Sequence, residues 1–252
     1  MRQRYTTFAL TLLVIFAYGL AGCADPTENM EEGQTFDLQT DEEPADAEEP
    51  DEPEETDEPE ETEEPEETEE EEAAADTRVY AINVPASTIG FIGSSPITGQ
   101  QSGTFEEFEG TFELAGDDFE SATVHAVIQT GSATTRNSTL QEALRVDILN
   151  TEEYPTAEFT SHEIEDQGGG TYRIAGEFNL HGVSRGLAFP AQVTLTDSSI
   201  DLNASFRINR SDWDIYYEGH GWQQVAGDEA ADAAIRDTVG LNLTIQADVE
   251  ED

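Results

Sequence analysis

Hydrophobic and polar residues alternate with a period of two along four long stretches in the second half of the chain. The run 238–249 is the most regular, with apolar residues at every second position and mostly polar ones between them. Similar runs cover residues 171–180, 187–195 and 200–208. Because successive strand side chains project to opposite faces, each run predicts a strand of an antiparallel sheet with one buried face.

Shorter alternating runs predict further strands earlier in the chain. Residues 79–84 and 89–93 predict the first two, and residues 124–128 and 157–164 predict two more. The stretch 99–114 is rich in glycine and acids, yet it keeps its phenylalanines on one face and its glutamates on the other. Together these runs predict about eight antiparallel strands, hence an all-β sandwich or barrel, which periodicity alone does not separate.

One clear helix is expected between two of these strands. The stretch 138–149 begins with Ser138 and Gln141 at the spacing of a capping box. A second, short and exposed helix is expected in the alanine- and aspartate-rich run 228–236. The first helix has an apolar stripe at i, i+4 and i+8, formed by Leu140, Leu144 and Ile148. The stripe predicts that this side of the helix faces a core.

The charge of the chain is extreme, with 57 acidic residues against 10 basic ones, all of them arginine. Residues 24–76 hold 28 of the acids and no base, so this segment is expected to be a disordered tether, because it cannot bury enough apolar surface to offset its ordering entropy. The tether could be a plain spacer, or it could bind cations or act in surface display. Residues 77–252 are expected to form one domain.

The remaining 29 acids and 8 arginines give residues 77–252 a formal charge of −21. Nonspecific nucleic-acid binding needs a basic surface, so that function is excluded. A domain so acidic and without lysine also suggests adaptation to high salt, where screening shortens the range of self-repulsion.

The N-terminus has the features of a secretory signal. Arg2 and Arg4 precede an almost wholly apolar run at residues 8–20, and Leu-Ala-Gly-Cys follows, ending at Cys23. The sequence Leu-Ala-Gly-Cys resembles the bacterial lipobox, so residues 1–22 are expected to be removed and Cys23 to carry acyl chains that anchor the protein without spanning the membrane. The alternative is a soluble secreted protein with a chance cysteine. No intrachain disulfide is possible, since Cys23 is the only cysteine.

No motif for catalysis or metal binding is present. The four histidines, His125, His162, His181 and His220, do not pair at metal-ligand spacing, and there is no phosphate-binding loop, dinucleotide-binding glycine pattern or nucleophile elbow. His181 precedes Gly182 and is expected to belong to a turn. We therefore expect no enzyme, no metal and no cofactor.

The segments GEFNLHGVSRGLAFPAQV and FRINRSDWDI are the clearest of an ordered set of five. The set resembles the YceI-like family, the polyisoprenoid-binding, lipocalin-like barrels of the bacterial envelope. It covers about residues 77–249 and also includes TGQQSGTFEEFEGTFEL, TRNSTLQEALRVDILNTEEYPTAEFTSHEI and TVGLNLTIQADV, in the family's order. The resemblance implies an eight-stranded lipocalin-like β-barrel, and a barrel of this size can hold one ligand.

The expected ligand site is an apolar lumen. The alternative is that the inward side chains fill a packed core. Arg210 could neutralise a ligand head group, or it could be a buried arginine paired with Asp212 or Asp214 that closes the barrel. The lumen candidates are Phe91, Phe108, Phe112, Phe159, Phe178, Phe189, Phe206, Ile208, Arg210 and Trp213.

The chain departs from the family pattern on the helix. It has Ala143-Leu144 where the family often has His-Leu, and Ile148-Leu149 where the family has a double aromatic. The resemblance therefore carries over no ligand contact from the helix.

The resemblance implies an envelope lipoprotein that binds or carries an isoprenoid-type amphiphilic lipid, such as a quinone or a polyprenyl chain. Its partners would be this apolar ligand and the membrane, through the N-terminal anchor, with the domain facing the periplasm or the cell exterior. The alternative is an interaction or structural protein of the envelope with a filled core and an acidic surface that binds partners or cations.

Overall fold

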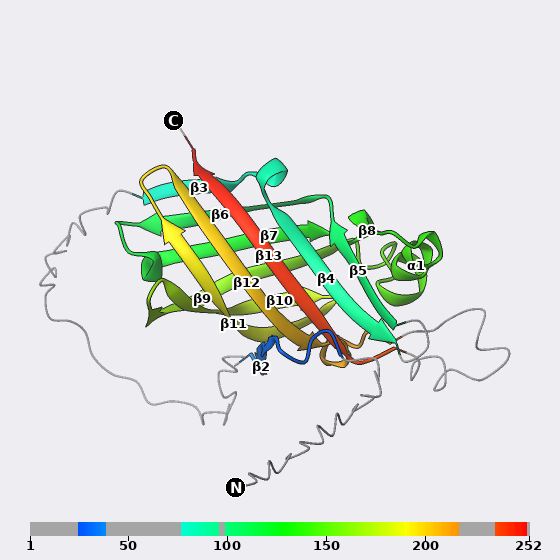
Figure 1. Ribbon diagram of the computed structural model, residues 1–252. Coiled ribbons are helices and arrows are strands. Elements are labelled where there is room, and N and C mark those ends of the chain that lie inside the picture. The colour runs from blue at the N-terminus through cyan, green and yellow to red at the C-terminus, as the bar shows by residue number, and fades with distance from the viewer. Residues whose placement is uncertain (1–24, 39–76, 96–98, 217–234, 251–252) are drawn as a thin grey trace, which may run out of the picture.

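Eight antiparallel strands close into a barrel in the computed structural model, which describes residues 25–38, 77–95, 99–216 and 235–250 (Figure 1). Around the barrel the order is β13, β12, β11, β10, β9, β7, β6 and β3, and β3 pairs with β13 again. The predicted eight-stranded antiparallel barrel is confirmed. Its strands are β3 (Thr77–Ile82), β6 (Phe108–Ala115), β7 (Ala122–Gln129), β9 (Thr156–Gly168), β10 (Thr171–Leu180), β11 (Val183–Leu195), β12 (Ser199–Asn209) and β13 (Thr238–Val249).

Three further strands extend the sheet from β13. β4 (Thr88–Ser95) pairs with β13 beside β3, β5 (Gly99–Phe105) pairs with β4, and β8 (Ala133–Thr135) pairs with β5. The stretch 99–114, predicted from one continuous pattern, is therefore split into β5 and β6, because its two halves pair with different strands. Short helical turns connect the elements: η1 (Val84–Ala86), η2 (Phe119–Ser121), η3 (Thr130–Ser132) and η5 (Arg210–Trp213).

The predicted helix is shorter and less regular than expected. It consists of α1 (Ser138–Ala143) and the π-helical turn η4 (Leu144–Ile148). Its N-cap is Asn137 rather than Ser138, because the Asn137 side-chain oxygen accepts hydrogen bonds from the backbone N–H groups of Thr139 and Leu140. No helix among the described residues has the length and apolar character needed to cross a bilayer.

The barrel has two different ends. One end, here the α1 end, carries α1, η5, the turn between β10 and β11, and the start of β13; the other, the η2 end, carries η2 and the turn between β11 and β12. At the η2 end Phe119 is 1% exposed, and its ring lies 6.2 Å from that of Phe112 and 5.0 Å from that of Tyr172. Tyr80, Leu114 and Ile200 are fully buried there. The η2 end is therefore closed by packed side chains.

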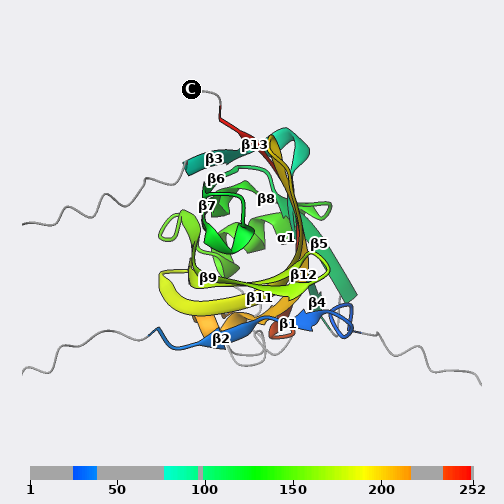
Figure 2. The same ribbon diagram turned by 90° about the vertical axis from the view of Figure 1, so that its left-hand side faces the viewer.

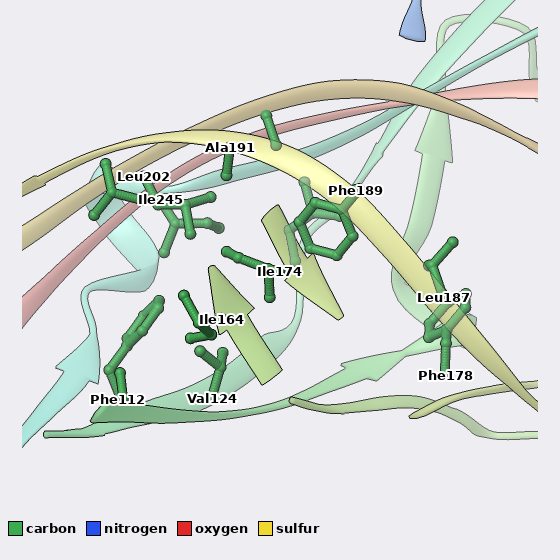
Figure 3. Close-up of a cluster of buried hydrophobic side chains, with 14 of the residues drawn as sticks. Phe112, Val124, Ile164, Ile174, Phe178, Leu187, Phe189, Ala191, Leu202 and Ile245 are labelled. Carbon is green, nitrogen blue, oxygen red and sulfur yellow. The ribbon is translucent and has the colours of Figure 1, made fainter. Parts of the chain in front are cut away.

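Inward side chains converge in the middle of the barrel. Figure 3 shows Phe112 and Val124 pointing from one wall toward Leu202 and Ile245 on the opposite wall, with Ile174 between them. All five side chains are buried in the hydrophobic core, and Ile174 is only 1% exposed. The alternation predicted for these strands thus places one face of each in the interior.

An N-terminal segment, residues 25–38, lies against the outside of the barrel, and we call it the strap (Figure 2). Its β1 (Glu31–Glu32) pairs in parallel with β12 at Phe206 and Arg207, and its β2 (Gln34–Phe36) pairs with β11 at residues 186–188. β11 and β12 pair directly only at residues 192–195 and 200–203. The strap therefore lies between β11 and β12 toward the α1 end, where these strands separate.

Close packing and ion pairs hold the strap. The backbone N–H of Gly33 donates to the Arg207 carbonyl at 2.8 Å, and a Cβ at Gly33 would lie 3.1 Å from side-chain atoms of both Leu187 and Phe206. The Phe36 ring lies where a Cβ on Gly186 would be. The ion pairs are Arg207–Glu32 at 3.3 Å, Arg185–Asp37 at 3.3 Å and Arg236–Asp25 at 3.7 Å.

The prediction of a disordered tether directly after Cys23 is wrong for residues 25–38. The acidic composition hid this, because strap strands of two and three residues carry no readable alternation and depend on backbone partners that only the folded barrel supplies. The signal peptide, Cys23, residues 39–76 and most of the run 228–236 lie outside the described residues.

We expect the heat stability of this protein to increase with salt up to molar concentrations. The charge of −21 on residues 77–252 destabilises the compact state by self-repulsion, and salt shortens its range from about 10 Å at 0.1 M to about 3 Å at 1 M. The check is a melting temperature measured across that range of NaCl. A melting temperature that stays flat or falls would contradict the prediction.

Candidate ligand-binding site

A cavity of about 450 Å³ occupies the α1-end half of the barrel interior. Its wall is almost wholly apolar and is formed by inward side chains of the barrel strands, by β4 and β5, and by α1 and η4. The side chains that fill the η2 end, including Tyr80, Leu114 and Phe119, do not line it. The two sequence-based alternatives, an open lumen and a filled core, are thus each correct for one half of the barrel.

Most of the predicted lumen residues lie on this wall. Two do not: Phe108, the first residue of β6, is buried in the core without reaching the cavity, and Trp213 is fully buried behind Phe178. The Trp213 indole N–H donates to the Phe178 carbonyl at 3.1 Å, so this residue ties η5 to β10. The residues that do line the cavity are Phe91, Phe112, Phe159, Phe178, Phe189, Phe206, Ile208 and Arg210.

The phenylalanine rings pack along the wall rather than across the lumen. Phe189 and Phe206 stack with centroids 4.4 Å apart and ring planes 10° apart, and Phe159 is tilted against Phe189 at 5.5 Å. Offset or tilted ring pairs of this kind stabilise a wall beyond simple burial. The cavity remains although these aromatic side chains meet one another.

The helix forms part of the cavity wall, although the family resemblance carried over no ligand contact from it. Leu140, Leu144 and Ile148, predicted to face a core, face the barrel interior, where they line the cavity, and Ile148 also packs against the core. The Leu149 N–H donates to the Leu144 carbonyl at 2.8 Å, an i to i+5 bond that widens the turn. Ile148 and the adjacent Leu149 thus both reach the cavity. The i, i+4 spacing of the predicted stripe includes Ile148 only, so the sequence did not reveal Leu149. The sequence also missed Ile215 and Ile235, which line the cavity outside any alternating run.

Arg210 is buried at the α1 end with its hydrogen-bond donors engaged. It is 4% exposed and donates to the carbonyls of Ile215 at 2.6 Å, Ile235 at 3.3 Å and Arg236 at 3.3 Å. Among the described residues it forms an ion pair with Asp237 at 3.0 Å, and not with Asp212 or Asp214, the partners considered from the sequence. The contacts favour the predicted closing role, because the guanidinium joins η5 to the residues before β13.

The comparison with protein families decides the relationship. Residues 80–247 match the model of the YceI-like domain, which is most of the chain. The chain belongs to the YceI-like family. The predicted membership is confirmed.

Relatives of this YceI-like protein match over part of their length. It is 33% identical over 92 residues to a UPF0312 protein of Photorhabdus laumondii, covering 36% of this chain and 47% of the relative. It is 34% identical over 92 residues to protein YceI of Escherichia coli O17:K52:H18, covering 36% of this chain and 48% of that protein. The matched part spans about half the length of these curated relatives.

Two solved structures share the fold of this YceI-like protein. BcnA of Burkholderia cenocepacia has a TM-score of 0.56 at 15% identity, covering 66% of this chain and 98% of BcnA. A polyisoprenoid binding domain from Saccharophagus degradans, implicated in plant cell wall breakdown, has a TM-score of 0.53 at 17% identity, covering 68% of this chain and 98% of that domain. At these identities the likeness establishes the fold alone.

Three of the four histidines, His125, His162 and His181, lie among the described residues of this YceI-like protein. No group of three or more His, Cys, Asp or Glu side chains within the described ranges is placed to hold a metal ion. His181 has a positive φ of 54° and its ring lies 4.2 Å from that of Tyr154, so it belongs to the β10–β11 turn, as predicted. Burial lowers the pKa of His181, although a hydrogen bond with the Trp213 backbone acts in the opposite direction.

We expect His181 to make this protein less stable in acid. The folded state favours the neutral imidazole, while the unfolded chain takes up protons near its ordinary pKa of about 6.5. The contribution is therefore full above pH ~6.5 and is lost as the pH falls below it. Asparagine tolerates the left-handed backbone at this position. Between pH 7.5 and 5.5 the melting temperature should therefore fall less in the His181→Asn variant than in the unsubstituted protein. Equal losses in both proteins would contradict this; His125→Asn, at an exposed site, is the control.

Proposed function

We propose that this protein is an envelope lipoprotein that holds an isoprenoid-type amphiphilic lipid, such as a quinone or a polyprenyl chain, in the barrel cavity. The observation that carries the proposal is the cavity itself, about 450 Å³ with an almost wholly apolar wall. A pocket of this volume and lining is typical of small-molecule sites. The similarity in fold to the polyisoprenoid binding domain from Saccharophagus degradans supports the ligand class.

The closed η2 end and the helix-bearing α1 end give the site a direction. Packed side chains such as Phe119 and Tyr80 stop a chain from passing through the barrel. An apolar tail would therefore enter from the α1 end and lie against Phe178, Phe189 and Phe206. Polar atoms are few and lie toward that same end, on Ser95, Gln101 and Asn137, where a head group would remain. The role proposed is binding, not catalysis.

The anchor is the second part of the proposal. Arg2, Arg4, the apolar run 8–20 and Leu-Ala-Gly-Cys support export and acylation at Cys23, with the barrel outside the inner membrane. Cys23→Ser should prevent acylation and shift the protein from the membrane fraction to the soluble fraction. A Cys23→Ser protein that is processed at the same site and still sediments with membranes would show that the anchor is elsewhere.

A chain-length series tests the ligand class. The soluble Cys23→Ser protein, freed of lipid, would be titrated with isoprenoid alcohols of 10, 15 and 20 carbons and with straight-chain alcohols of equal length. Each buried methylene contributes about 0.8 kcal/mol, so affinity should rise with length until the cavity is full, and the branched series should bind more tightly. No binding by either series would favour the alternative of a non-carrier envelope protein, and preference for straight chains would change the ligand class to fatty acyl groups.

A further inference from the structure

The strap begins beside the entrance of the cavity. The Asp25 carboxylate lies 3.7 Å from the Arg236 guanidinium. The Arg236 N–H donates to the Ser94 carbonyl at 2.9 Å, and the Arg236 carbonyl accepts from Arg210. Ser94, Arg210 and the adjacent Ile235 all line the cavity. The first described residue of the chain is thus placed at the α1 end.

This start of the strap is firmly held. Thr27 is 1% exposed, and its hydroxyl and backbone N–H donate to the Asp25 carboxylate at 2.7 and 3.0 Å. These bonds are the main cause of the lowered pKa of Asp25, so the carboxylate stays charged opposite Arg236. The Thr27 carbonyl accepts from the Arg207 guanidinium at 3.4 Å. Cys23 precedes Asp25 by two residues, a distance of at most about 7 Å of extended chain.

Exposed apolar side chains also lie at the α1 end, an observation independent of the contacts at the start of the strap. The described residues contain three large hydrophobic side chains that are strongly exposed: Phe36 at 40%, Val146 at 51% and Tyr216 at 48%. Phe36 lies on the strap against β11, Val146 lies in η4, and Tyr216 follows η5. All three are at the α1 end, although the segments that carry them are far apart in the sequence. Aromatic and aliphatic side chains placed in this way are typical of surfaces that rest on a membrane interface.

We propose that the strap holds the acylated N-terminus at the cavity entrance, so that the α1 end of the barrel rests on the lipid bilayer surface. This inference rests on the acylation of Cys23 proposed above. The entrance would then face the lipid that supplies the ligand, and an apolar tail could pass between bilayer and cavity without crossing bulk water.

The proposal changes the role of the acidic segment 39–76. This segment leaves the strap at residue 38 and returns to the barrel at Thr77, the first residue of β3, so both of its ends are fixed on the domain. The strap, and not the length of this segment, would therefore set the distance between anchor and barrel. The sequence-based picture of a spacer of some 40 Å, from about 5–6 Å × √n for a flexible chain, would not apply.

The orientation can be measured on the acylated protein in phosphatidylcholine vesicles, which avoid repulsion of the acidic domain. Cys23 has no free thiol once it is acylated, so a single introduced cysteine can carry a fluorophore. Glu142→Cys in α1 and Asp197→Cys in the β11–β12 turn each replace one exposed acid, at opposite ends of the barrel. The strand β12, which runs between these ends, has 11 residues. That is about 36 Å along the strand, or roughly 25–30 Å along the barrel axis after a strand tilt of about 35–45°. Energy transfer to a head-group acceptor should be several-fold greater from position 142 than from position 197.

Two deletions of 14 residues separate a strap from a spacer. Removing residues 45–58 shortens the acidic segment and should leave both energy-transfer values unchanged. Removing residues 25–38 turns the acidic segment into a true tether and should lower transfer from position 142 and abolish the difference between the two positions. The proposal is overturned if transfer from positions 142 and 197 is equal in the full-length protein, or if only the 45–58 deletion changes it.

Failure of this inference and failure of the proposed function give different results. The mass of the N-terminal peptide reports acylation, and the lipid that copurifies reports ligand binding, both independently of the label distances. A peptide without acyl chains would overturn the anchor and the docking together. An acylated, lipid-loaded protein without orientation would overturn the docking alone.

Discussion

Replacing Gly93 with phenylalanine is expected to reduce lipid affinity more than tenfold while leaving the barrel folded and at least as stable to heat. Gly93 lies on β4 in the cavity wall, and no atom of the described residues lies within 4 Å of the position that a Cβ would occupy there. A phenyl ring at this position would project into the cavity and take the space of the ligand tail. Stability should not fall, because the substitution fills a void and replaces glycine in a strand.

Thr123→Phe is the matched control, since this substitution adds the same ring to the exposed face of β7. Affinity would be measured by titrating both soluble variants with the isoprenoid alcohol that binds best to the unsubstituted protein. Unchanged affinity of Gly93→Phe, with the fold intact by circular dichroism, would show that the ligand does not occupy this cavity.

Arg210→Met is expected to lower the free energy of unfolding by about 1.5–3 kcal/mol, because it leaves three carbonyls without the charged donor that they share. The Asp237 carboxylate is 63% exposed, so it stays hydrated and adds little to the loss. For a domain of this size, each kcal/mol corresponds to roughly 2–4 °C in melting temperature. The control is Arg173→Met at the η2 end, where a partly exposed guanidinium is 3.4 Å from Glu163 and Glu165 and should contribute about 1 kcal/mol or less.

The same pair of variants decides between the two roles of Arg210. If the guanidinium closes the barrel, Arg210→Met melts well below Arg173→Met even when both proteins are free of lipid. If the guanidinium instead neutralises a head group, Arg210→Met keeps its melting temperature without lipid and loses affinity only for anionic lipids. The second outcome would contradict the contacts described here.

The strands were predictable because a period of two is a local property of the chain. The alternation in residues 200–208 and 238–249 is sufficient to specify two long strands, which the structure pairs over their whole length. The barrel, by contrast, depends on which strands meet, and the family resemblance supplied that information. The break between β5 and β6 could not be seen, because both halves of the stretch 99–114 carry the same pattern.

The cavity and the strap lay beyond sequence reasoning for different reasons. Whether inward side chains fill a barrel depends on how its strands are arranged around the interior. Leu114, which is packed at one end, and Phe178, which lines the cavity at the other, are both apolar positions of an alternating run. The strap depends on a gap between β11 and β12 that exists only in the folded barrel. Arg210 was identified as important, but its partner Asp237 is 27 residues away in the chain and was not evident.

The proposed function requires the cavity to hold an isoprenoid-type lipid. Native mass spectrometry of the mature Cys23→Ser protein, mixed with a lipid extract of its own membranes, tests it most directly. The account predicts one adduct per barrel, whose fragments identify an isoprenoid chain, and no adduct on the Gly93→Phe variant. A barrel that always remains empty, or one whose adduct persists unchanged in Gly93→Phe, would contradict it.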